Sequence, residues 1–489
     1  MKMAGSKGYL IIDIGTGNVR VAVTDSAGKV LHVERDNVHY VKDELYPDAL
    51  YFEPDTLWMQ ILALAESVIQ RAHDIEIVAV TASSQREGIV LLDAEGRSLI
   101  GLPNHDHRGR EWEDYKEEGD YIYSKTGRYP SSLFSAQKLV GIKDRRSDVF
   151  DQLATMVSIS DWAQFQLSGI AIYEHSQASE TLLYDVEKQQ WSDRLCAIFS
   201  IDKSILPPLK SSGTILGTIK PEVASALHLS PETVVVVGGA DTQLAIKSTE
   251  PLVNDIVVVS GTTTPVVKVV NSFVIDEKQR TWSNRHVEEN AFILEANAGV
   301  TGLNYQRLKD IFYPNEGYDV IEKELDALQE TQCIASLGSL IAEEKSSLTK
   351  GGFIFNTPVS HTLNRACFVE ATLWDMACCI KENFDTVCEV TEYNKDYVWA
   401  CGGGFQSKLL RQYVANLLNK KVLIREGYQQ ASVAGGALVC SEALGGSASP
   451  DTAYETVNPA PKEFYYKQYK EWKEVRQGFK QSALEDAMI

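Results

Sequence analysis

Residues 9–34 read YLIIDIGTGNVRVAVTDSAGKVLHVE and contain the pattern that decides the fold. An apolar strand ends at Asp13, a turn of glycine and threonine follows, and the alternating segment VRVAVTD predicts a second strand. The next four residues, SAGK, are typical of a hairpin turn, after which VLHVE predicts a third strand. This stretch therefore predicts three consecutive strands, with a carboxylate at the end of the first.

The same plan returns in residues 255–276, DIVVVSGTTTPVVKVVNSFVID. An apolar strand leads into a Gly261-Thr262 turn, which is followed by an alternating strand, a polar turn and another strand. Two copies about half a chain apart predict two similarly folded domains that face each other, and we place these domains at 1–248 and 249–489. The alternative is that turns of glycine and threonine are simply common between strands.

Predicted helices and strands alternate around these two units. Residues 55–73 and 149–169 have the apolar spacing of helices, whereas residues 75–84 and 233–241 have the composition of buried strands. Such alternation is typical of α/β layers, so we expect an α/β protein.

Length, composition and charge limit the classes of function. With 489 residues the chain is too long for one ordinary core, and its 44% hydrophobic and 23% charged residues are typical of globular proteins. The formal net charge of −20 argues against nucleic acid or an anionic membrane as the main partner. No apolar run reaches the ~18 residues of a membrane helix. The eight cysteines show no metal-binding spacing, so we expect a soluble cytoplasmic protein.

A second carboxylate follows the most hydrophobic strand. Residues 234–245 read VVVVGGADTQLA, where four valines precede two glycines and then Asp241. One explanation is that Asp241 caps the next helix from a solvated loop. The other is that the strand fixes the carboxylate at the rim of a cleft for chemistry.

The turn after Asp13 has the groups that bind phosphate. Its backbone N–H groups around Gly15 and the hydroxyl of Thr16 suit phosphate oxygens, and Arg20 on the next strand could reach a terminal phosphate. Asp13 itself could bind Mg²⁺, directly or through water. The turn is neither a Walker loop nor a dinucleotide fingerprint, because no GK[ST] follows and the next element is a strand.

Two later turns complete a candidate nucleotide site. The turn SGTTTPV offers Gly261, Thr262 and Thr263 to the same polyphosphate from the opposite domain. The segment ACGGGFQSKLLRQYVANLL places three glycines between a strand and a helix, where the missing side chains leave room for a base and ribose. In this order, the turns predict an ATP cleft between two related domains. The three glycines are Gly402, Gly403 and Gly404.

The chain resembles the FGGY family of carbohydrate kinases, within the actin, hexokinase and Hsp70-like superfamily. The resemblance covers nearly the whole length, in family order, and implies two actin-like (ribonuclease H-like) domains with a nucleotide cleft between them. It also implies ATP with Mg²⁺ as cofactors and Asp241 as the general base for the attacking hydroxyl. The segments that carry it are DIGTGNVR, SSQREGIVLLD, NHDHRGREW, LFSAQKL, ISDWAQFQLSG, GGADTQ, SGTTTPV and ACGGGFQSKLLRQ.

The resemblance also implies a sugar site in the first domain. The segment SQREGIV would place Arg86 and Glu87 on neighbouring hydroxyls, with a surface ion pair as the alternative. Asp106 and His107 match a family segment on the sugar side, although a lone histidine is often structural. Gln243 would face the substrate, or else lie exposed beside the helix cap.

Several residues depart from the family pattern and bear on the substrate. Gly141 replaces a usual tryptophan, and Leu133 stands where glycerol kinases have tyrosine. The Arg-Glu-Gly-Ile-Val segment is similar to the branch that contains autoinducer-2 kinases. We therefore expect a kinase for a small sugar or polyol, such as the ketopentose xylulose, with autoinducer-2 (a dihydroxypentanedione) or glycerol as alternatives. A sugar sensor or a chaperone-type ATPase is the alternative outside the kinases, and we expect a homodimer.

Overall fold

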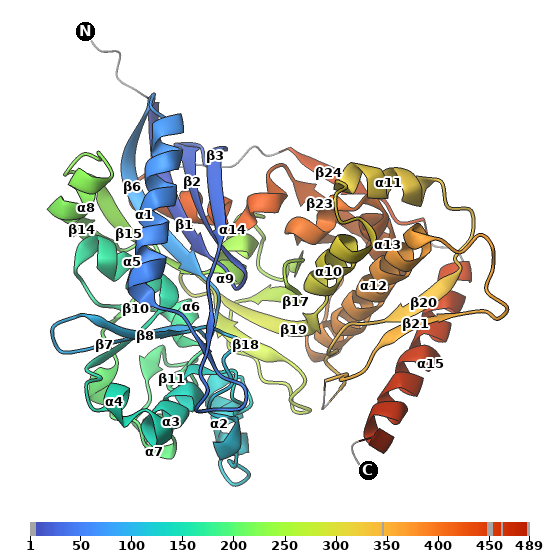
Figure 1. Cartoon of the computed structure of the whole chain (residues 1–489), viewed down its shortest axis with the longest axis horizontal. Helices are drawn as coiled ribbons and strands as arrows, with labels where there is room; N and C mark the ends of the chain where they lie inside the picture. Colours follow the sequence, from blue (N-terminus) through green and yellow to red (C-terminus); the bar gives the residue numbers. More distant parts are fainter. Residues whose placement is uncertain (1–5, 345–346, 447–452, 461–462, 487–489) are drawn as a thin grey trace.

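Two mixed β-sheets form the centres of two lobes in the computed structural model, which describes residues 6–344, 347–446, 453–460 and 463–486 (Figure 1). The first sheet has the strand order β14-β15-β6-β1-β2-β3, in which β1 runs antiparallel to β2 and parallel to β6, and β15 runs parallel to β6. Its strands are β1 (Ser6–Ile14), β2 (Asn18–Asp25), β3 (Val30–Asn37), β6 (Ile75–Ser84), β14 (Ile215–Thr218) and β15 (Val234–Ala240).

The second sheet repeats this topology. Its order is β18-β19-β17-β16-β22-β23-β24, with β16 antiparallel to β17 and parallel to β22. The run β19-β17-β16-β22-β23 therefore matches β3-β2-β1-β6-β15, and the predicted pair of ribonuclease H-like lobes is confirmed. The strands are β16 (Ile256–Val259), β17 (Thr263–Val270), β18 (Trp282–Arg285), β19 (Phe292–Val300), β22 (Tyr397–Cys401), β23 (Lys421–Arg425) and β24 (Tyr454–Val457).

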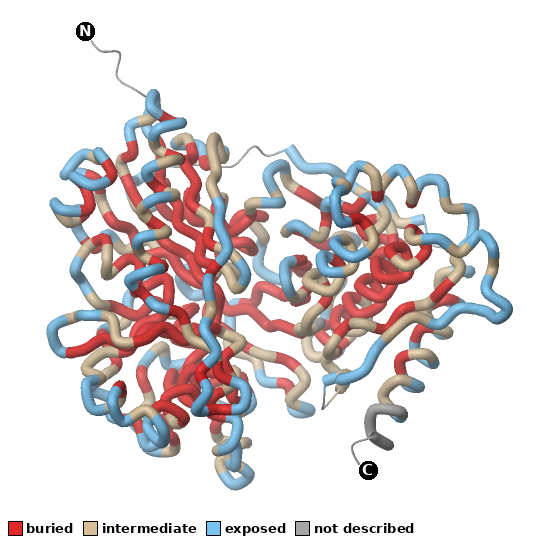
Figure 2. Tube along the Cα trace, viewed as in Figure 1, coloured by how far each residue is buried: buried red, intermediate tan, exposed pale blue. Residues whose placement is uncertain are grey.

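Helices cover both sheets, and buried positions are concentrated in the strands and along α12 (Figure 2). In α1, Leu57, Ile61 and Val68 recur at helical spacing and pack into the apolar core of the first lobe. In α15, Trp472 is fully buried and donates its ring N–H to Asp375 at 2.8 Å. The main helices are α1 (Pro54–Arg71), α5 (Ile159–Ser168), α9 (Asp241–Lys247), α12 (Arg365–Val390), α13 (Lys408–Leu418), α14 (Ala431–Ala443) and α15 (Glu463–Asp486).

Shorter elements connect these layers. The strands are β4 (Val41–Lys42), β5 (Leu50–Tyr51), β7 (Ile89–Leu92), β8 (Ser98–Leu102), β9 (Thr155–Ser158), β10 (Tyr173–Glu174), β11 (Tyr184–Asp185), β12 (Gln190–Trp191), β13 (Leu209–Lys210), β20 (Cys333–Ser336) and β21 (Gly352–Phe355). The helices are α2 (Gly119–Thr126), α3 (Ser135–Arg145), α4 (Ser147–Phe150), α6 (His175–Ala178), α7 (Asp193–Ile198), α8 (Pro221–Ala226), α10 (Gly302–Phe312) and α11 (Tyr318–Asp326).

The prediction of one helix over residues 149–169 was wrong. Residues 155–158 form β9, which pairs with β7, and the helix α5 begins only at Ile159. The boundary has a local cause, because the Ser158 hydroxyl accepts the backbone N–H of Asp161 and caps the helix.

A helix of the second half of the chain packs against the first sheet. Helix α14 follows the last parallel strand of the second sheet, yet it packs on β1 and β6 of the first sheet and on α9. The contact with α9 is close, because a Cβ at Gly435 would lie 1.9 Å from the carbonyl oxygen of Leu244. Figure 1 shows α9 and α14 together between the sheets.

A subdomain of the first lobe also contacts the second sheet. It includes the three-stranded sheet β8-β7-β9, and its apolar cluster takes in Val270 and Phe292 from β17 and β19. The hydroxyl of Tyr123 donates to the carbonyl of Thr281 at 2.7 Å, and the Ser283 N–H donates to the carbonyl of Gly127 at 3.3 Å. The β18 edge of the second sheet is therefore anchored to the first lobe.

All eight cysteines are free thiols, and Cys378 and Cys379 are fully buried in α12. Among the described residues, no helix combines the length and apolar content needed to cross a bilayer.

Candidate active site

The two predicted carboxylates lie at the same edge of the first sheet. In the register of the sheet, Asp13 is opposite Ser83 on β6, and Ser83 is opposite Gly239 on β15, two residues before Asp241. Because β1, β6 and β15 are parallel, their carboxyl ends meet at this edge. The fold therefore brings Asp13 and Asp241, which are more than two hundred residues apart, into one site.

Asp13 is fully buried and accepts contacts from both halves of the chain. Its Oδ1 accepts the Ser83 hydroxyl at 2.7 Å, and its Oδ2 accepts the hydroxyl of Ser432, the second residue of α14, at 2.8 Å. The guanidinium of Arg20 lies 2.5 Å from Oδ2 and donates from Nη1 to Gln430 at 3.2 Å. The charge of Asp13 is thus balanced within the protein, and Arg20 keeps a buried Nε with no partner among the described residues.

Asp241 is half-buried at the first turn of α9. The residue at the cap position is Ala240, which has no capping side chain, and the Asp241 carboxylate accepts only from Thr242 among the described residues, at 2.6 Å from its N–H and 3.2 Å from its hydroxyl. These contacts are not those of a helix cap. Burial and the negative charge of Asp13 raise the pKa of Asp241 to about 6, and the positive charge of Arg86 partly offsets this.

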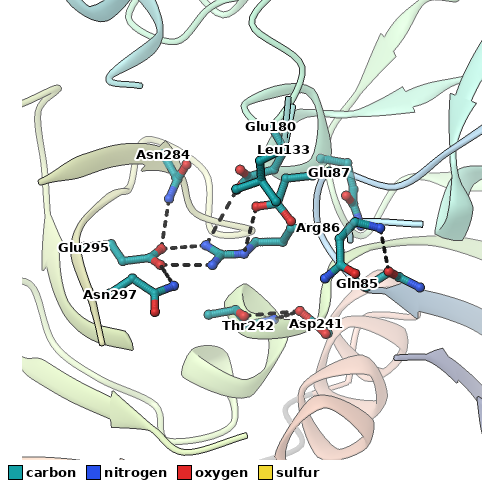
Figure 3. A network of polar contacts seen from close by, with 12 residues as sticks. Gln85, Arg86, Glu87, Leu133, Glu180, Asp241, Thr242, Asn284, Glu295 and Asn297 are labelled. Carbon is teal, nitrogen blue, oxygen red and sulfur yellow. Dashed lines mark hydrogen bonds and ion pairs between the residues drawn. The ribbon is translucent and has the colours of Figure 1, made fainter. Parts of the chain in front are cut away.

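Arg86 is buried and pairs with the opposite lobe. Its Nη1 and Nη2 donate to the two carboxylate oxygens of Glu295 on β19, at 2.5 and 2.9 Å (Figure 3). The Glu180 carboxylate lies 3.7 Å from Nη1, and a Glu87 oxygen lies 3.9 Å from Nε. The alternative of a surface ion pair between Arg86 and Glu87 is wrong, because their exposed fractions are 7% and 5%.

Glu87 has a strained backbone and an unpaired carboxyl group. Its φ of 61° is in the left-handed region that residues other than glycine rarely adopt. Among the described residues, its carboxylate accepts no hydrogen bond, and its one ion-pair contact is the distant Arg86 Nε. Burial and the charge of Glu180 raise the pKa of Glu87, while Arg86, Arg128 and Lys138 oppose the shift. A buried acceptor without a donor indicates a ligand contact.

The side chains of residues 106–108 form their hydrogen bonds within the first lobe. Asp106 accepts the Leu50 N–H at 2.9 Å and Nε of Arg108 at 2.8 Å, so its two oxygens are both used within the protein. His107 Nδ1 lies 3.0 Å from the Ser132 hydroxyl, and burial lowers the pKa of His107 to about 4. These contacts favour the structural explanation for His107, and they occupy both oxygens of Asp106 within the first lobe.

Gln243 is fully buried in α9, and neither end of its amide has a partner among the described residues. The alternative of an exposed amide is therefore wrong. A buried unpaired amide two residues after Asp241 agrees with the prediction that Gln243 faces a ligand.

The two glycine turns of the second lobe pack against each other. Ser260 donates its N–H to the carbonyl of Cys401 at 2.8 Å and accepts the N–H of Gly404 at 3.1 Å. A Cβ at Gly404 would lie 2.1 Å from the Ser260 hydroxyl, and Gly402 has a φ of 96°, so both positions require glycine. Gly403 is exposed, as are Gly261 and Thr262, while Thr263 is half-buried at the start of β17.

Residues 428–432 connect these turns to the Asp13 turn. The carbonyl of Tyr428 accepts the Gly402 N–H at 2.8 Å, while Gln430 and Ser432 contact Arg20 and Asp13. On the first lobe, Thr16 accepts the Asn104 side-chain amide at 2.9 Å, and the N–H of Gly15 donates to the carbonyl of Asn18. The predicted nucleotide-binding residues of both lobes are therefore joined through one short segment.

A cavity of about 550 Å³ is lined by residues 424–429 and 453–455, at the edge of the second sheet. It contains none of the predicted site residues and shares only Tyr428 and Gln429 with the segment 428–432. The candidate site therefore lies outside this cavity.

The sequence did not identify several residues of the site. Glu295 is the main one, and its signal is a charge inside the apolar strand FILEANAGV. Lys138 is fully buried, donates to the carbonyl of Asn104 at 3.2 Å and also contacts the carbonyl of Leu133. Burial lowers the pKa of Lys138. The other polar residues of the site are Ser83, Arg128, Glu180, Asn284, Asn297 and Ser432.

Comparison with solved structures shows that the fold is that of two-lobed sugar kinases. A xylulose kinase from Lactobacillus acidophilus superposes with a TM-score of 0.82 at 18% identity, covering 96% of this chain and 98% of that one. A glycerol kinase from Plasmodium falciparum, solved with ADP, has a TM-score of 0.80 at 19% identity and covers both chains completely.

Sequence comparison then gives the family. Models of the FGGY family of carbohydrate kinases match residues 8–247 with the N-terminal domain and residues 348–444 with the C-terminal domain. The chain belongs to the FGGY family of carbohydrate kinases, and it is a phosphotransferase with an alcohol group as acceptor.

Two curated relatives extend this result. A protein of Bacillus subtilis (strain 168), provisionally named a sugar kinase, is 50% identical over 479 residues, which are 98% of each chain. The autoinducer-2 kinase of Escherichia coli (strain K12) is 30% identical over 330 residues, which are 64% of this chain and 61% of that protein. Membership of a kinase family implies the use of ATP.

Proposed function

We propose that the protein transfers the terminal phosphoryl group of ATP to a hydroxyl of a small sugar or polyol, such as the ketopentose xylulose. The observation that supports this most is the position of Asp241. Its carboxylate lies at a strand end beside Asp13 and Arg86, with a pKa raised to about 6. A carboxylate in that range is ionised at neutral pH and basic enough to accept the proton of an attacking hydroxyl.

The chemistry assigns a role to each group. The acceptor oxygen forms a bond to the terminal phosphorus while the bond from that phosphorus to ADP breaks, and the hydroxyl proton passes to Asp241. Arg86 and Glu87 supply a charged donor and an acceptor, 3.9 Å apart, for neighbouring hydroxyls. Gln243 supplies a free amide from the same helix as the base. Asp106 and His107 support the first lobe instead of contacting the sugar.

ATP binding is assigned to the three turns. Gly15, Thr16 and Arg20 would face the phosphates from the first lobe, and Gly261, Thr262 and Thr263 from the second. The loop of Gly402, Gly403 and Gly404 would lie along the nucleoside, where Gly403 has open space.

The residues at Asp13 fit Mg²⁺ through water. The described residues contain no group of three acidic, histidine or cysteine side chains placed to bind a metal. Asp13 already accepts two hydroxyls and pairs with Arg20, so water between Asp13 and the ion agrees with this donor set. When bound, the ion neutralises charge on the transferring phosphoryl group.

A second candidate substrate is autoinducer-2. The relatives named autoinducer-2 kinases are 29–30% identical to this chain over 63–64% of its length. The segment Arg86–Val90 carries the same resemblance. We keep the division at 248 and 249 and the homodimer as further proposals.

The test is a product screen with a matched variant. The purified enzyme is incubated with ATP, Mg²⁺ and a panel of xylulose, ribulose, glycerol and dihydroxypentanedione, and phosphorylated products are identified by mass spectrometry. We expect one acceptor to dominate, and Asp241→Asn to lose roughly 10²–10⁴ in kcat while the acceptor still binds in calorimetry. ATP turnover that ignores every acceptor and survives Asp241→Asn would favour a chaperone-type ATPase. Acceptor binding without product would favour a sensor.

A further inference from the structure

Glu295 occupies an unusual position in the second sheet. Along β19, Leu294 and Ala296 point into the apolar core of the second lobe, so the alternate residues Ile293, Glu295 and Asn297 are on the other face. Ile293 on that face packs in a cluster with Ala245 and Ile246 of α9. The helix that carries Asp241 therefore covers the same face from which Glu295 projects.

Two amides fix the Glu295 carboxylate in place. The side-chain amide of Asn284 donates to Oε2 at 3.3 Å, and that of Asn297 donates to Oε1 at 3.2 Å (Figure 3). Glu295 is 1% exposed, and β19 is paired on both sides by β18 and β17. Asn284 also accepts a hydrogen bond from Arg128 of the first lobe. The carboxylate is therefore held by a rigid sheet that is itself anchored to the first lobe.

This carboxylate fixes the direction of Arg86 and balances its positive charge. The two bonds to Glu295 use one N–H of each terminal nitrogen, so the N–H of Nε stays free, with a Glu87 oxygen 3.9 Å from Nε. The neighbouring cation Arg128 pairs with Glu180 at 2.5 Å, and Lys138 is turned to main-chain carbonyls. Among the described residues, Arg86, Arg128 and Lys138 therefore each have an acceptor of their own.

We infer that Glu295 is a positioning residue which aims Arg86 at the acceptor from the opposite lobe and restricts the acceptor to uncharged sugars and polyols. This inference rests on the proposed function. A carboxylate-bearing acceptor would meet an Arg86 whose charge is already matched, beside the negative charges of Asp241 and Glu180. A hydroxyl needs only one N–H donor, and the pair with Glu295 leaves the Nε N–H of Arg86 free to donate.

Glu295→Gln tests this inference, because it keeps the shape of the side chain and releases one positive charge on Arg86. Initial rates are measured with xylulose, ribulose and glycerol as neutral acceptors and with gluconate as the acidic one. We expect the KM of the neutral acceptor to rise at least about tenfold while the KM of ATP stays within about twofold. We also expect the kcat/KM of gluconate relative to that of the neutral acceptor to rise at least about tenfold.

Glu344→Gln is the matched control. Glu344 is half-buried in the second lobe outside the site, and it forms the same two-bonded pair with the buried Arg476, at 2.8 and 2.6 Å. We expect this variant to lower the melting temperature without changing either KM. Glu295→Asp keeps the charge and should keep the preference for neutral acceptors. Asn297→Ala, which removes one support of Glu295, gives a milder KM change if Glu295→Gln does not fold.

The outcomes separate the inference from the proposed function. A parent enzyme that phosphorylates a neutral acceptor, with KM values unchanged in Glu295→Gln and Asn297→Ala, would overturn the inference alone. A parent enzyme that prefers gluconate would also overturn it. A parent enzyme that phosphorylates nothing in the panel would overturn the proposed function and the inference together.

Discussion

The hydroxyl oxygen of Ser176 lies 3.0 Å from the backbone nitrogen of Ala240, the residue immediately before Asp241, and accepts its hydrogen bond. Ser176 in turn donates to Glu174, whose Oε2 also accepts the N–H groups of Ser176 and Gln177 at 2.8 and 3.1 Å. Helix α6 thus fixes the main chain at the end of β15. The direction of the Asp241 carboxylate depends on this support.

Replacing Ser176 tests that support. We expect Ser176→Ala to lower kcat about fivefold, which corresponds to about 1 kcal/mol for one hydrogen bond, and to leave the acceptor KM unchanged. Ser176→Thr keeps the hydroxyl and should restore kcat. Steady-state kinetics of the three proteins measure this, and an equal rise in acceptor KM would show that the serine affects binding instead.

Activity should fall in acid as Asp241 takes up a proton. The base must be ionised, so kcat/KM is expected to decrease roughly tenfold per pH unit below the Asp241 pKa, which burial and Asp13 raise to about 6. Thr242→Val removes the hydroxyl that donates to the ionised carboxylate, and it should move the acid limb to higher pH. A pH–rate profile of both proteins measures this. An acid limb near the ordinary aspartate value would contradict the assignment.

The same pKa shift should affect stability. Because the folded-state pKa of Asp241 is above its unfolded value of 3.8, the ionised carboxylate destabilises the fold at neutral and alkaline pH. This penalty begins to decrease as pH falls below about 6, and it is gone below 3.8. Asp241→Asn should therefore raise the melting temperature at neutral pH and lose that advantage in acid. Thermal unfolding across this pH range measures it, and an advantage independent of pH would point to a cause other than charge.

Glu87 should behave as a neutral carboxyl group. Burial and Glu180 raise its pKa, so it keeps its proton at neutral pH and can both donate and accept. We expect Glu87→Gln to keep the acceptor KM within about threefold of the parent, and Glu87→Ala to raise it at least about tenfold, with the ATP KM unchanged in both. As pH rises, the acceptor KM of the parent should change while that of Glu87→Gln stays constant. A larger effect on the ATP KM would place Glu87 elsewhere.

Gly403 offers a direct probe of the nucleotide site. A Cβ there would meet nothing in the protein nearer than the Gln406 amide at 3.8 Å, so Gly403→Ala should fold normally. If the nucleoside lies along this loop, the ATP KM rises at least about threefold and the acceptor KM does not change. Gly478→Ala, in α15 with open space around it, is the control. Identical ATP KM values in the two variants would remove Gly403 from the site.

The repeated strand unit made the fold predictable. Apolar runs, glycine turns and alternation occur locally in the sequence, and they indicated both lobes. The packing of α14 against α9 was not predictable. It depends on a contact between Leu244 and Gly435, which are far apart in the sequence, and no local pattern indicates it. Residues 149–169 were misread because a short buried strand and a helix have similar apolar content.

The candidate site was predictable where a residue follows a strand. Asp13 lies near the end of β1, and Asp241 directly follows β15. Because these strands run parallel, the sheet itself brings the two carboxylates together. Asp106 was assigned to the sugar side from the family resemblance, and the sequence did not indicate that both of its oxygens have partners in the first lobe, Leu50 and Arg108. Glu295 was missed because the sequence does not indicate which strand of the second lobe contacts Arg86 of the first lobe.

The packing of α14 also orders events during synthesis. Ser432 completes the surroundings of Asp13, and Gly436 of the same helix lies against Ile11, so β1 is completed by a helix that is synthesised much later. A nascent chain that ends before α14 lacks the helix that packs against β1 and β6 of the first sheet. Translation therefore delivers the Asp13 carboxylate early and its neighbours late, so a polypeptide made only as far as α13 lacks the Ser432 contact to Asp13.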